Sequence, residues 1–120
     1  MYLRRKRKLK DDRGILSEKE IIQILKEHSD ILKKYNVTKI GLFGSYIRGE
    51  QEKQSDIDFL VEFDRGAFGK DFEGYFDCYM DLLFFLEDVF GKKIDLLTVE
   101  EISPYIKPYV LKEVKYLERT

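Results

Sequence analysis

The sequence predicts one domain of the mixed α/β (α+β) class, in which a small sheet is flanked by helices. Its 120 residues are enough for one compact core and too few for two ordinary domains. Segments with helical periodicity alternate with three short runs rich in β-branched residues. The expected order is α-β-α-β-α-β-α, with a mixed sheet of three strands or slightly more.

Residues 1–14 are expected to form a flexible basic arm, and residues 15–120 the domain itself. The arm carries five cationic side chains at positions 4–8 and has neither a helical nor a strand period. Clustered Lys and Arg bind nucleic acid by releasing counterions from its phosphates. A solvated tail, or one that docks on an acidic partner, is an equally open interpretation.

Composition excludes membrane-spanning and disulfide-rich classes. The chain is 43% hydrophobic and 38% charged, and no apolar run approaches the roughly 20 residues of a membrane span. Cys78 is the only cysteine, and the basic start is not followed by the apolar stretch of a signal peptide. The expected location is cytoplasmic.

The first helix is expected to begin after Ser17 and to stop at Asn36. Ser17 and Glu20 form a capping-box pattern, in which each side chain accepts a hydrogen bond from the other residue's backbone N–H. The apolar stripe of this helix comprises Ile21, Ile24, Leu25, His28, Ile31, Leu32 and Tyr35. A histidine on such a stripe is more often packed and hydrogen-bonded than functional.

Three strands and three more helices are expected after it. The strands are predicted at 37–43, 56–63 and 92–99, and the helices at 46–50, 71–90 and 103–117. Gly91 is typical of a helix end, and Ser103-Pro104 is typical of a helix start. Tyr105, Tyr109 and Tyr116 would share one face of the last helix, which favours either a partner interface or simple amphipathic cover.

The most informative stretch is GLFGSYIRGEQEKQSDIDFLV, in which ten residues separate Gly44-Ser45 from Asp56-Ile57-Asp58. Alternate strand residues point to one face, so Asp56 and Asp58 would present two carboxylates side by side. Asp95, in the third strand, supplies another. A right-handed crossover makes the second and third strands parallel, which brings all three carboxylates to one end of the sheet.

Three carboxylates at one edge suit hard divalent cations. Two Mg²⁺ ions, or Mn²⁺ in their place, bind such oxygens and can promote transfer chemistry at phosphorus. Gly44 permits close backbone approach, and the Ser45 hydroxyl and nearby N–H groups can hold phosphates. Arg48, one helical turn later, would add a forked cation. A nucleoside triphosphate such as ATP fits this arrangement.

These residues resemble the signature of the minimal nucleotidyltransferases of the DNA polymerase β-like superfamily. That signature is a Gly-Ser pair, ten residues, Asp-x-Asp and an acid on a later strand, and the resemblance spans roughly residues 16–118. It implies a nucleotidyltransferase fold and Mg²⁺-dependent transfer from ATP. It also implies that Asp56, Asp58 and Asp95 are catalytic metal ligands, and that Gly44, Ser45 and Arg48 bind the nucleotide.

The resemblance also carries an implication about the biological partner. Members that consist of the catalytic domain alone are commonly encoded beside a HEPN-domain protein, as the antitoxin of a toxin–antitoxin pair. Transfer of AMP to a tyrosine of the HEPN toxin would then silence the toxin. A non-catalytic module that neutralises its partner by occlusion, nucleic-acid binding through the arm, and a homo-oligomer all stay open.

Overall fold

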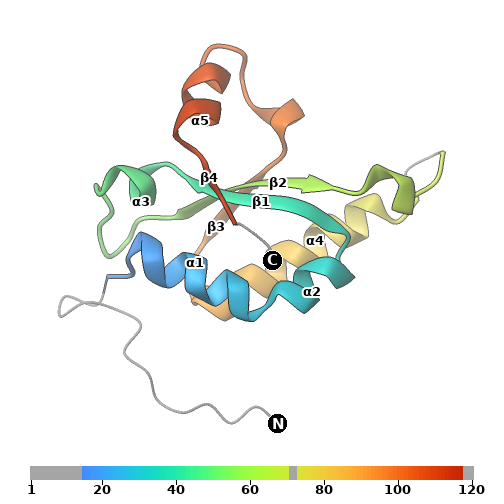
Figure 1. Ribbon diagram of the computed structural model, residues 1–120, viewed down its shortest axis with the longest axis horizontal. Helices are drawn as coiled ribbons and strands as arrows, with labels where there is room; N and C mark the ends of the chain where they lie inside the picture. The colour runs from blue at the N-terminus through green and yellow to red at the C-terminus, as the bar shows by residue number, and fades with distance from the viewer. Residues whose placement is uncertain (1–14, 71–72, 118–120) are drawn as a thin grey trace, which may run out of the picture.

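A four-stranded mixed sheet forms the centre of the molecule (Figure 1). The computed structural model describes residues 15–70 and 73–117, so the proposed arm at 1–14 lies outside the described residues. The strands are β1 (Val37–Phe43), β2 (Ile57–Phe63), β3 (Ile94–Leu97) and β4 (Lys115–Tyr116), in the order β3-β2-β1-β4. β2 is antiparallel to β1 and parallel to β3, as the crossover argument predicted. The predicted fold class is confirmed.

The single helix predicted between Ser17 and Asn36 is instead two helices. α1 (Glu18–Glu27) begins at the predicted capping box, where the Ser17 Oγ and Glu20 Oε1 atoms accept hydrogen bonds of 3.1 and 3.0 Å from each other's backbone N–H. α2 (Ser29–Lys34) follows after a one-residue break. Asn36, with a positive φ of 63°, then turns the chain into β1.

His28 makes the break between α1 and α2. The His28 Nδ1 atom lies 2.8 Å from the Ile24 carbonyl oxygen, which the backbone N–H of His28 would bind in a continuous helix. The backbone N–H bonds to Leu25 O at 3.0 Å instead. The imidazole also packs edge-on against Phe85, with 5.4 Å between ring centroids. His28 is therefore a packed, hydrogen-bonded residue, as its place on the apolar stripe suggested.

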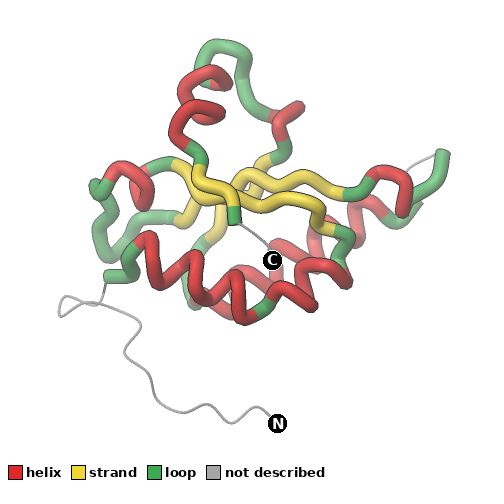
Figure 2. Tube along the Cα trace, viewed as in Figure 1, coloured by secondary structure: helices red, strands yellow, loops and turns green. Residues whose placement is uncertain are grey.

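α1, α2 and α4 (Tyr75–Phe90) cover one face of the sheet, and Figure 2 shows them as one layer of helix beneath the strands. The main core lies between these layers. Its most completely buried members are Ile21, Leu25, Leu32, Ile40, Leu42, Ile57, Phe59, Val61, Leu82 and Leu86. The helix expected at 71–90 is α4, which begins at Tyr75. Its apolar stretch is not wholly internal, because Phe84 is 58% exposed.

The other face of the sheet has a lighter cover. α3 (Ser45–Arg48) follows β1, the 3-10 turns η1 (Arg65–Ala67) and η2 (Val99–Glu101) follow β2 and β3, and α5 (Lys107–Glu113) stands above the strands (Figure 1). A second cluster of buried apolar residues holds α5 in place: Phe43, Leu60, Ile102 and Val110. This cluster is much smaller than the main core, so α5 is held by few apolar contacts.

The prediction of a last helix over 103–117 was wrong at both ends. α5 begins only at Lys107, and Val114 is extended, with φ −62° and ψ 136°. The chain then forms β4, which pairs with Gly41 and Leu42 of β1. The three tyrosines therefore do not share a helical face, because Tyr105 precedes α5, only Tyr109 lies in it, and Tyr116 lies in β4.

Gly41 explains why β4 can pair here. A Cβ atom at Gly41 would lie 2.6 Å from Val114 Cγ2 and 3.0 Å from the Lys115 carbonyl oxygen. Such distances are shorter than van der Waals contact, so any side chain at this position would push β4 away. The glycine makes room for the chain after α5 to return to the sheet edge.

Candidate active site

The parallel pairing of β2 and β3 brings two of the proposed site residues together. Asp58 and Asp95 are direct partners in the register, as Ile57 and Ile94 are one position earlier. The two isoleucines are buried in the main core, so the two carboxylates point to the opposite face. The two side chains lie close enough that the Asp95 carboxyl contributes to the raised pKa of Asp58.

The electrostatics of this pair disfavour two negative charges. The pKa of Asp58 is raised to about 7, and burial is the largest cause. The neighbouring Asp95 carboxyl and the charge of Asp56 also raise this pKa, whereas the charge of Arg48 lowers it. Like charges held close in a partly desolvated site favour either a proton or a cation between them.

Asp56 lies just outside β2 and is less closely engaged. Its Oδ2 atom is 3.9 Å from Lys93 Nζ, and its side chain is 39% exposed. The charge of Asp56 still acts on neighbouring groups, because it is the second-largest cause, after burial, of the raised pKa of Tyr46 in α3. Within residues 15–70 and 73–117, no three His, Cys, Asp or Glu side chains are grouped closely enough to hold a metal ion. The three-carboxylate metal site therefore stays a prediction.

Gly44 places its backbone directly against Asp58. Its φ of 81° and ψ of −151° belong to a region that is essentially restricted to glycine. A Cβ atom added to it would lie 2.1 Å from Asp58 Oδ2, which is an impossible contact. The Gly44 N–H also donates a hydrogen bond of 2.7 Å to Glu113 Oε2. Ser45 follows as the first residue of α3 and is half-buried.

Arg48 is the last residue of α3, and its side chain extends toward the carboxylate of Glu113. Its Nη1 atom lies 3.2 and 3.1 Å from Glu113 Oε1 and Oε2, and its Nε atom donates to Glu50 Oε1 at 2.9 Å. The Glu113 carboxylate therefore accepts hydrogen bonds from both Gly44 and Arg48. Glu113 was not predicted as a site residue, because the helix expected over 103–117 continues past it and gives no indication of its direction relative to Gly44.

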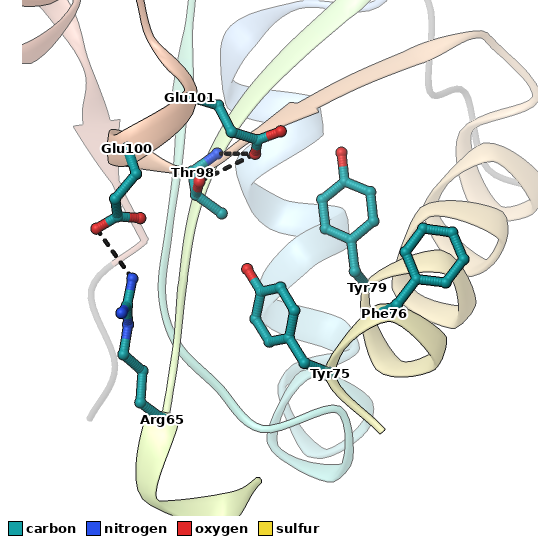
Figure 3. Close-up of a pocket in the computed structure, with 7 residues that line it drawn as sticks. All are labelled: Arg65, Tyr75, Phe76, Tyr79, Thr98, Glu100 and Glu101. Carbon is teal, nitrogen blue, oxygen red and sulfur yellow. Dashed lines mark hydrogen bonds and ion pairs between the residues drawn. The ribbon is translucent and has the colours of Figure 1, made fainter. Parts of the chain in front are cut away.

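A cavity of about 480 Å³ lies away from these carboxylates (Figure 3). It is lined by Tyr75, Phe76 and Tyr79 of α4 together with Arg65, Thr98, Glu100 and Glu101. Thr98 follows the carboxyl end of β3, whereas Asp95 lies near its amino end. The cavity therefore opens at the opposite end of the parallel strands. We assign the candidate site to the Asp58 and Asp95 carboxylates and not to this cavity, because the groups that can bind cations and phosphates lie beside those carboxylates.

The family model described as a nucleotidyltransferase domain matches residues 19–117. This chain belongs to the nucleotidyltransferase domain family. It is 44% identical to "Putative protein adenylyltransferase MJ1379" of Methanocaldococcus jannaschii over 100 aligned residues. This alignment covers 82% of this chain and 95% of the relative. It is 34% identical over 105 residues to protein adenylyltransferase MntA of Thermococcus cleftensis, which covers 87% and 99%.

Two solved structures share the fold. One, described as a "putative minimal nucleotidyltransferase", superposes with a TM-score of 0.66 at 22% identity, over 83% of this chain and 95% of that one. A toxin–antitoxin with AMP-PNP superposes with a TM-score of 0.55 at 24% identity, over 82% and 73%. Over the ranges that the structure describes, no helix of this nucleotidyltransferase is both long and apolar enough to span a bilayer.

Proposed function

We propose that this nucleotidyltransferase transfers AMP from ATP to a hydroxyl group of a partner protein, a tyrosine of a HEPN-type toxin, and so acts as its antitoxin. The observation that carries the proposal is the paired Asp58 and Asp95 carboxylates, packed against the bare backbone of Gly44. The names of the relatives support protein as the acceptor, since they are protein adenylyltransferases. A toxin–antitoxin with AMP-PNP has the same fold.

The residues at the site fit Mg²⁺, or Mn²⁺, by the chemistry of their donors. Carboxylate oxygens are hard ligands, and the closeness of Asp58 and Asp95 gives this pair a need for positive charge. In the proposal Asp56, Asp58 and Asp95 hold two ions. Such ions, when bound, activate an attacking oxygen and neutralise the leaving pyrophosphate.

The protein groups have separate tasks in the proposed reaction. The acceptor hydroxyl oxygen forms a bond to the α-phosphorus of ATP, and the bond from that phosphorus to the pyrophosphate oxygen breaks. Asp95 accepts the proton that the hydroxyl loses. The Gly44 N–H, the Ser45 hydroxyl and the Arg48 guanidinium hold the β- and γ-phosphates, where charge accumulates as pyrophosphate leaves.

The decisive experiment follows the label of ATP into the partner protein. Wild type and Asp58→Asn are each incubated with magnesium, the product of the neighbouring gene as the candidate partner, and ATP labelled at either the α- or the γ-phosphate. We expect α-label on the partner with wild type only, and no γ-label with either protein. Absence of α-label with folded wild type would refute adenylyl transfer.

Occlusion is the second candidate, and the surface formed by α5 and the turn before it favours this function. Tyr105 is 86% exposed and Tyr109 is 73% exposed, and exposed tyrosines are enriched at protein interfaces. Full neutralisation of the toxin by Asp58→Asn, with no label transferred, would support occlusion. Nucleic-acid binding through the arm predicts steep salt dependence and no effect of Asp58→Asn, and deletion of residues 1–14 tests it.

A further inference from the structure

Glu113 occupies the point at which the proposed function requires phosphate oxygens. It is the last residue of α5, and its carboxylate accepts a hydrogen bond from the Gly44 N–H at 2.7 Å. The same carboxylate pairs through both oxygens with Arg48 Nη1, at 3.1 and 3.2 Å. Two groups that were expected to hold the nucleotide thus hold a side chain of the protein itself.

A carboxylate and a phosphate can bind the same hydrogen-bond donors, here Gly44 and Arg48. Both are anions that accept from a backbone N–H and from the fork of a guanidinium. The Gly44 N–H has one hydrogen to donate, so it cannot serve Glu113 and a phosphate oxygen fully at the same time, and the two negative charges repel. Asp58 also lies against Gly44, where an added Cβ atom would be 2.1 Å from Asp58 Oδ2, so an incoming phosphate would approach a second negative charge.

The surroundings of Glu113 allow its side chain to leave. The side chain is 22% exposed, so a path to solvent exists. α5 presents only Val110 to the small second cluster, and the backbone becomes extended at Val114, one residue later. Arg48 would keep its second partner, Glu50, whose Oε1 lies 2.9 Å from Nε. Departure of Glu113 therefore does not leave the guanidinium without a counter-charge.

We propose that Glu113 is an internal competitor of the nucleotide, which occupies the phosphate-binding donors in the free protein and is displaced by the β- and γ-phosphates. This inference rests on the proposed function. When pyrophosphate leaves, Glu113 returns to Gly44 and Arg48. The residue thus weakens the binding of both the triphosphate and the pyrophosphate product, and it favours release of the product.

The test measures ligand affinity by calorimetry in the presence of Mg²⁺ for wild type, Glu113→Gln and Glu50→Gln. Glu50→Gln is the matched control, because Glu50 pairs with the same guanidinium without contacting Gly44. We expect Glu113→Gln to bind AMP-PNP and pyrophosphate roughly tenfold more tightly, which is the typical effect of one charge-assisted hydrogen bond. AMP, which lacks the β- and γ-phosphates, should bind all three proteins equally.

Each alternative result has a definite meaning. Equal or weaker binding of AMP-PNP by Glu113→Gln would overturn the inference, since Glu113 would then position Arg48 or have no role. Equal tightening by Glu50→Gln would also overturn it, because a general charge effect would explain both. If no protein binds AMP-PNP, the proposed function fails together with the inference. Thermal unfolding verifies each fold, and Glu113→Ala replaces Glu113→Gln in the comparison if the latter does not fold.

Discussion

Replacement of Asp58 by Asn should make the metal-free protein more stable at neutral pH, although it removes a proposed metal ligand. The pKa of Asp58 is raised from 3.8 to about 7 in the folded protein. That difference of about 3 units corresponds to about 4 kcal/mol at 1.36 kcal/mol per unit. Because the group is only about half buried, solvent screening reduces this penalty to roughly 2 kcal/mol.

The sign of the pH dependence follows from proton binding. Between pH 4 and 7 the folded state keeps the Asp58 proton while the unfolded state loses it, so the free energy of unfolding falls as pH rises. Above pH 7 both states are ionised and the penalty is complete. Below pH 4 both states are protonated and no penalty exists. Asn carries no charge, so the variant lacks this fall.

The assay is urea unfolding in EDTA at pH 5 and pH 8, with Asp88→Asn as a control at an exposed carboxylate of α4. We expect the stability advantage of Asp58→Asn to be larger at pH 8 than at pH 5. Added Mg²⁺ should stabilise wild type and leave Asp58→Asn unchanged. An equal difference at both pH values, or a wild type more stable than the variant at pH 8, would refute the reasoning.

Four further substitutions, one of them a control, test the packing of the domain. Gly44→Ala should cost about 3 kcal/mol in urea unfolding and abolish AMP-PNP binding measured by calorimetry, because its Cβ would clash with Asp58 and its φ is unfavourable for alanine. Gly41→Ala should cost about 1–3 kcal/mol and speed hydrogen exchange in β4, which the new methyl group would displace. Leu86→Ala, at a fully buried position, should cost about 2–5 kcal/mol in the same unfolding assay, whereas Phe84→Ser at an exposed position of the same helix should be nearly neutral.

The sequence was sufficient to predict the sheet around the carboxylates. Strand periodicity and the handedness of the crossover predicted that β2 and β3 are parallel, and that Asp58 and Asp95 point away from the main core. The capping box likewise located the start of α1. These predictions succeeded because each depends either on a pattern within a short stretch of chain or on the β-α-β crossover, which is almost always right-handed.

The features that were missed depend on contacts of single residues, which no periodic pattern in the sequence indicates. β4 is only two residues long and has no period of its own, and its place is set by the missing side chain of Gly41 in another strand. The break at His28 depends on a side chain that competes with the backbone for one carbonyl group. The position of Glu113 depends on where α5 ends, which the longer predicted helix obscured.

The brevity of the outer strands has a consequence for the behaviour of the protein at high concentration. β3 and β4, at the two edges of the sheet, are four and two residues long, whereas the inner strands each have seven residues. Short edges offer few free backbone groups on which another chain could add a strand, and this discourages aggregation. Displacement of β4 would expose the longer β1 as an edge, so a side chain at Gly41 would reduce solubility as well as stability.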